Sequence, residues 1–174
     1  MRPLTELAGR SLAALALAWT LAGPPAPVAD ARTSRRGARQ AVAATFEARV
    51  EGFLRQSGFD YRKVKTNSWY VNMAGKELTQ IRVLVGAGPN SIAVGAVVAP
   101  KARLRVTADS LYKMMKLSYD LNYVRVCIDP DEDLLVMSQV KEPWLTPQEF
   151  KSTVERVAAA ADRAYAEVRQ FLNQ

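Results

Sequence analysis

The chain has 174 residues, of which 49% are hydrophobic and 24% are charged, with a formal net charge of +7. This size and balance suit one globular domain with a hydrophobic core. The absence of histidine excludes serine–histidine and cysteine–histidine nucleophile systems and histidine metal sites, and the single cysteine, Cys127, excludes an internal disulfide.

The first 31 residues have the three-part order of a secretory signal peptide. Basic residues precede an uncharged apolar stretch over 12–22, and the small-x-small pattern of 29–31 suits cleavage. The apolar stretch is shorter than the ~20 residues that span a bilayer, so we expect no transmembrane span in the mature chain. We therefore expect removal of residues 1–31 after Ala31 and a periplasmic or secreted protein. An uncleaved leader is the alternative.

Residues 32–39 are polar and carry four arginines. This composition predicts a flexible basic tail rather than part of the core. Clustered arginines are attracted to anionic lipid. An envelope-associated structural protein that uses this tail on anionic surfaces is therefore the alternative to the binding function inferred below.

Residues 40–174 are predicted to form one α+β domain. Apolar residues recur at helical spacing over about 40–56, and Ser57-Gly58 ends this first helix. Four short strands with period-2 patterning follow, over 60–65, 68–74, 79–86 and 91–98. The turns between them are rich in glycine, proline and asparagine, which is typical of an antiparallel meander.

A second helix, a hairpin and a third helix complete the predicted domain. Thr107 has the residue type of an N-cap for the second helix. The hairpin strands cover 123–129 and 133–140 around an acidic turn. Thr146 and Glu149 predict a capping box that opens the last helix. The predicted order is α-β-β-β-β-α-β-β-α, an antiparallel sheet with packed helices.

Three stretches of the chain form a set that points to a known fold. They are the helix end 117–122 with the strand 124–126, the hairpin 129–136, and the segment 145–150 that opens the terminal helix. This set resembles the YbjN family, whose fold is similar to that of type III secretion (CesT-like) chaperones. The resemblance implies a small peptide- or protein-binding module, often dimeric, with no catalytic residues to transfer.

Two apolar groups are the candidate peptide-binding residues. Trp69, Val71 and Met73 alternate on one strand face, and Met114 and Met115 are adjacent on the second helix. Methionine-rich apolar surfaces suit adaptable peptide binding. Burial of both groups in the core is the alternative.

The acidic turn begins with the spacing of a calcium loop, because Asp129, Asp131 and Asp133 fill its positions 1, 3 and 5. Position 6 is Leu134 rather than glycine, and position 12 is Val140 rather than glutamate. We therefore expect a hairpin turn without a metal ion. The sequence indicates no cofactor and no catalytic residue, so we expect no enzymatic activity.

Basic residues alternate with apolar ones at Lys101, Arg103 and Arg105, and Lys63 and Lys65 lie on another extended segment. Basic residues on the outer face of a strand are usually solvated or block edge pairing, so a nucleic-acid partner is not expected. The sequence instead favours an exported, non-enzymatic homodimer that binds a peptide or protein segment. The expected mode is strand addition at an open sheet edge or insertion into an apolar groove.

Overall fold

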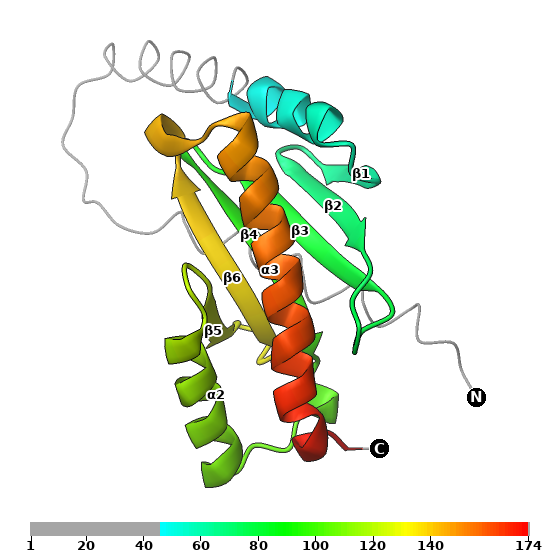
Figure 1. Cartoon of the computed structure of the whole chain (residues 1–174), viewed down its shortest axis with the longest axis vertical. Coiled ribbons are helices and arrows are strands. Elements are labelled where there is room, and N and C mark those ends of the chain that lie inside the picture. The colour runs from blue at the N-terminus through cyan, green and yellow to red at the C-terminus, as the bar shows by residue number, and fades with distance from the viewer. Residues whose placement is uncertain (1–45, 174) are drawn as a thin grey trace, which may run out of the picture.

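A computed structural model describes residues 46–173 of the chain (Figure 1). The predicted signal peptide (1–31) and basic tail (32–39) lie outside the described residues. Within 46–173, none of the helices combines the length and apolar character that crossing a membrane requires.

Six strands form one antiparallel sheet in the order β1-β2-β3-β4-β6-β5. Their bounds are β1 (Tyr61–Lys65), β2 (Ser68–Met73), β3 (Ile81–Ala87), β4 (Ser91–Ala99), β5 (Arg125–Ile128) and β6 (Leu134–Lys141). The helices are a first helix over 46–57, α2 (Ala108–Asp120) and α3 (Pro147–Val168). The predicted α+β fold class and element order are confirmed.

The two longer helices begin at the predicted residues. Thr107 accepts a hydrogen bond from the backbone N–H of Ser110 at 3.1 Å, and the Ser110 hydroxyl accepts one from the N–H of Thr107 at 2.8 Å. Thr146 accepts from the N–H of Glu149 at 3.1 Å. The carboxylate of Glu149 accepts from the hydroxyl of Thr153, so α3 has one of the two bonds of the predicted capping box.

The core lies between one face of the sheet, here called the inner face, and the helices. Figure 1 shows α3 crossing this face, with α2 beside it. Four alanines of α3 are buried (Ala158, Ala160, Ala161 and Ala164), and their small side chains let the helix lie close to the strands. Fully buried side chains of the sheet face them, among them Val71, Val83, Val85, Ile92, Val94 and Val136.

A carboxylate of α3 fastens the β2–β3 loop to the helix. Asp162 accepts hydrogen bonds from the backbone N–H groups of Lys76 (3.0 Å), Glu77 (2.9 Å) and Leu78 (2.8 Å). These bonds lower the pKa of Asp162, with the bond from Leu78 as the largest cause. A Cβ atom at Gly75 would lie 2.2 Å from Oδ1 of Asp162, so this close approach requires glycine.

Candidate protein-binding surfaces

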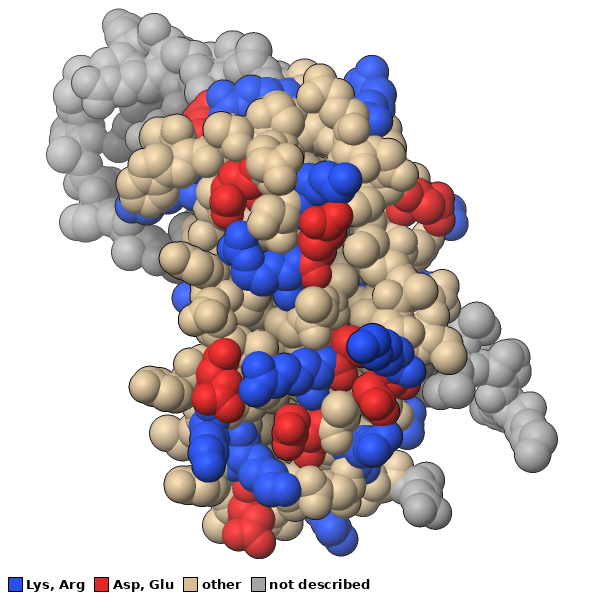
Figure 2. Space-filling view, in the orientation of Figure 1, with Lys and Arg blue, Asp and Glu red and all other residues tan. Residues whose placement is uncertain are grey.

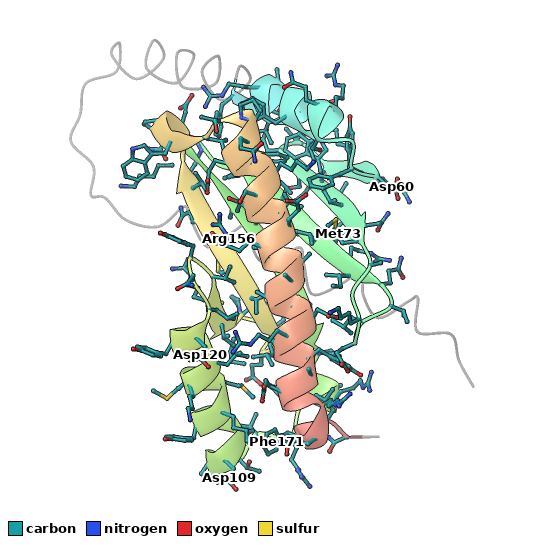
Figure 3. The ribbon with its side chains drawn as sticks, viewed as in Figure 1. Asp60, Met73, Asp109, Asp120, Arg156 and Phe171 are labelled. Carbon is teal, nitrogen blue, oxygen red and sulfur yellow. The ribbon has the colours of Figure 1, made fainter. Side chains whose placement is uncertain are left out.

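The helix α2 has two apolar sides, and only one of them is buried. Met114 and Leu117 pack into the core, and the pair between Asp120 and Arg163 of α3, 3.4 Å apart, holds the end of the helix (Figure 3). The other side exposes 75% of Met115 and 89% of Tyr119. With β5 it lines a shallow groove of about 520 Å³. This α2–β5 surface includes Leu111, Met115, Tyr119, Cys127 and Ile128, and the buried Met114 also borders the groove.

Neither edge strand of the sheet is well suited to pair with an added strand. The β1 edge carries Arg62, Lys63 and Lys65, and its register shifts between Lys63 and Lys65. Charges and bulges of this kind protect an edge strand from pairing with another chain. The β5 edge is four residues long, and the N–H of Val126 donates to the hydroxyl of Ser118 in α2 at 3.4 Å. The apolar surfaces are therefore better candidates for partner binding than the edges.

A second apolar surface lies on the outer face of the sheet, opposite α3. It is a trough of about 440 Å³, and most of its lining atoms are apolar. Side chains alternate between the two faces of a strand, and every second residue of β3, β4 and β6 faces the core. The residues between them point into the trough. No helix of residues 46–173 packs on this face. The residues that shape this outer trough are Leu84, Gly86, Ala93, Gly95, Leu135 and Met137.

The predicted peptide-binding residues fall in two places. Trp69 and Val71 are fully buried on the inner face of β2. Both residues therefore belong to the core, which is the alternative to peptide binding that the sequence analysis names. Met73 is half-buried at the end of the same strand (Figure 3). Met114 and Met115 line the α2–β5 surface at the opposite edge of the sheet. The structure therefore does not bring the two groups together.

Sequence reasoning missed Tyr119, Ile128 and the whole outer trough. Tyr119 follows Leu111 and Met115 at a spacing of four residues, so one helical stripe could have identified it. The trough also has a signal, because β4 is apolar at both its inward and its outward positions. Such a near-continuous apolar run is typical of a strand that is covered on both faces.

The acidic turn has a structural role. Asp129 accepts from the N–H of Asp133 at 2.9 Å, and Asp133 accepts from the N–H of Lys101 at 2.8 Å, which ties the hairpin to the chain after β4. Burial raises the pKa of Asp129. Within residues 46–173, no three cysteine or acidic side chains are grouped so that they could hold a metal ion.

The alternating basic residues after β4 do not lie on a strand. Lys101–Arg103 form a 3₁₀ helix, so the extended conformation inferred from that alternation is wrong. Lys63 lies 2.9 Å from Glu47 and 3.4 Å from Glu51 of the first helix. The hydrogen bond to Glu47 raises the pKa of Lys63. This lysine therefore serves to join β1 to the first helix.

An antiparallel sheet with this element order and helices on one face is the fold of YbjN and of type III secretion chaperones, as the sequence predicted. One chain of the ExsC–ExsE complex has a TM-score of 0.51 at 12% identity, covering 75% of this chain and 96% of its own length. YbjN from E. coli also has a TM-score of 0.51 at 12% identity, covering 73% and 94%.

The type III secretion chaperone SycH of Yersinia pestis, solved with a fragment of YscM2, is 13% identical with a TM-score of 0.47, covering 70% of this chain and 98% of its own. No protein-family model and no curated protein matches the sequence. At these identities the similarities define the fold alone.

Proposed function

We propose that this protein is an exported, non-enzymatic, chaperone-like homodimer that binds a segment of another protein. The observation that carries the proposal is the pair of apolar surfaces that no element of residues 46–173 covers, the α2–β5 surface and the outer trough. Large exposed apolar patches on a soluble domain mark interaction sites. Export rests on the sequence of residues 1–31, and the non-enzymatic role rests on the chain having no histidine and no catalytic motif.

The α2–β5 surface is the proposed contact between two copies of the chain. A two-fold axis would place the stripe of Leu111, Met115 and Tyr119 against the same stripe of the second copy. Ile128, which is 46% exposed, extends the apolar area onto β5. This arrangement leaves the outer trough, on the other face of the sheet, free for a partner.

Substitution of Met115 by glutamate tests the homodimer. We expect the full chain to sediment at twice its mass of 19.2 kDa. Met115→Glu should raise the dissociation constant of the dimer at least about 100-fold, because the two-fold axis places both new charges in an apolar contact. Trp144→Glu is the matched control, since Trp144 is also an exposed apolar residue (68%) but lies outside the α2–β5 surface.

Sedimentation equilibrium of the three proteins over a range of concentrations gives the dissociation constants. A monomeric wild-type chain, or an equal effect of the two substitutions, would contradict the homodimer.

Selection from a display library of segments of about 20 residues tests the binding function, because a segment of that length spans a small domain when helical. We expect the immobilised full chain to enrich a subset of segments whose binding survives purification. A selection that enriches no segment over bare resin would contradict the proposed function.

A further inference from the structure

Residues 46–173 provide no layer over the outer face of the sheet, although the composition of that face is typical of a covered one. The inward residues of β4, Ile92, Val94, Ala96 and Val98, are buried beneath the helices. The outward residues of the same strand, Ala93, Gly95 and Val97, are also apolar or small. Sheets with one solvated face normally alternate apolar and polar residues, whereas strands covered on both faces are apolar throughout. β4 has the second pattern, but the described residues cover only one face.

The two strands that carry the walls of the trough are about as far apart as an α-helix is wide. Leu84 of β3 and Met137 of β6 both pair with Gly95 of β4, so they are two strand spacings apart, about 10 Å. An α-helix with its side chains is about 10–12 Å wide. Gly86 and Ala93 make the next row and add little or no side chain to the floor. A helix can therefore approach the strand backbone between larger walls.

The charges around the trough have one sign. The six strands contain no aspartate or glutamate. Basic residues occupy outward positions on four of the strands, and within residues 46–173 none of them has a carboxylate within 4.0 Å. Arg82 lies over the ring of Tyr70 at 5.5 Å, and Lys141 lies over Trp144 at 5.8 Å. These unpaired residues are Arg62, Lys65, Arg82, Arg125 and Lys141.

The opposite, helical side of the molecule is different. Figure 2 shows acidic and basic side chains interspersed over that side. Several of its basic residues have carboxylate partners, for example Arg156 with Glu149 and Arg169 with Glu77, although Lys113 and Lys116 of α2 have none within 4.0 Å among residues 46–173. The outer face differs from the helical side because its strands carry basic residues and no carboxylate.

We infer that the outer trough binds an acidic amphipathic α-helix of a partner protein. The inference rests on the proposed function and adds the class of segment that is bound. The apolar stripe of the helix would contact Leu84, Gly86 and Met137, and its carboxylates would reach the basic residues at the margin. Four arginines over 32–39 make the N-terminal tail of this chain a poor electrostatic match for the same margin.

Three synthetic peptides of about 14 residues, the helix length that matches the span from Ser91 to Val97, provide the test. One has leucines at helical spacing and glutamates elsewhere, the second has lysines in place of the glutamates, and the third has the composition of the first in shuffled order. Binding to the full chain is measured by fluorescence anisotropy at two salt concentrations. The glutamate helix should bind at least about 10-fold more tightly than the other two, and more weakly at high salt.

Two variants of the chain sharpen the test. Arg82→Glu with Lys141→Glu should reverse the preference between the glutamate and lysine helices. Lys151→Glu, on α3, is the matched control and should change neither affinity.

Gly86→Val should fill the trough, because a Cβ at Gly86 meets no atom closer than 3.9 Å. We expect this variant to bind at least about 10-fold more weakly while its melting temperature rises by about 2 °C.

Several results would overturn the inference. These are equal binding of the three peptides, no reversal by the double substitution, an equal effect of Lys151→Glu, or undiminished binding by Gly86→Val. Salt-dependent binding of vesicles of anionic phospholipid, with no binding of the glutamate helix, would assign the face to a membrane instead. Display selection that enriches segments without acidic residues would also overturn it and would leave the proposed function intact.

Discussion

Replacing Trp69 by alanine is expected to lower the free energy of unfolding by about 3–5 kcal/mol. Trp69 is the largest fully buried side chain of residues 46–173, and alanine would leave a cavity on the inner face of the sheet. Chemical denaturation of the full chain, followed by circular dichroism, measures the change. This is the largest effect that we expect from a single substitution.

Two further substitutions act as controls for Trp69. The buried indole N–H of Trp69 meets no hydrogen-bond acceptor among residues 46–173, so Trp69→Phe is expected to lose packing but no hydrogen bond within this part of the chain. We expect a loss of about 1–2 kcal/mol for phenylalanine, less than for alanine. Trp144→Ala, at a residue that is 68% exposed, should change stability by less than about 0.5 kcal/mol. Equal losses at Trp69 and Trp144 would contradict the core position.

Substitution of Asp162 by asparagine should lower the free energy of unfolding by about 2 kcal/mol. The carboxylate accepts three backbone N–H bonds from Lys76, Glu77 and Leu78. An asparagine side chain has one acceptor oxygen, and its amide group would meet N–H donors. Water reaches this loop and replaces part of the lost bonding, so the loss is smaller than for a buried carboxylate. Thermal denaturation at neutral pH measures it.

The same carboxylate gives a pH dependence with a defined sign. Its pKa is lower in the folded protein than in the unfolded chain, so folded Asp162 binds a proton less readily. Its contribution to stability is therefore complete above the ordinary aspartate pKa and is lost as the pH falls through the folded value. Asp162→Asn should therefore weaken the loss of stability in acid. Parallel pH profiles for wild type and Asp162→Asn would contradict this role.

Local patterns in the sequence were sufficient for the element order and most helix ends. Thr107 caps α2 through residues three positions away, and the alternation in β4 repeats every second residue. The side of a strand that faces the core depends on where a distant helix packs. For that reason the sequence left two interpretations of Trp69, and the structure places it in the core.

The α2–β5 surface and the outer trough were harder to predict, because a residue is exposed only where no other element packs against it. The helical stripe that contains Met115 and Tyr119 has the same apolar pattern in the sequence as a stripe that faces the core. It is exposed because α3 and β5 contact other sides of α2. The bond from Leu78 to Asp162 joins residues 84 positions apart, and nothing near Asp162 in the sequence indicates it. Contacts of this range are the part of the structure that local reasoning misses.

The position of α3 after all six strands has a consequence for the order of folding. Strands β1 to β4 pair with their neighbours in sequence and could meet early, but their inner face is covered by residues 147–168. Contacts that join distant parts of a chain form late because closing the intervening loop costs entropy. Until α3 has been synthesised, β3 and β4 lack the helix that packs on their inner face, where Val83 and Val94 are buried. The inner core of the sheet is therefore completed only after residues 147–168 have been synthesised.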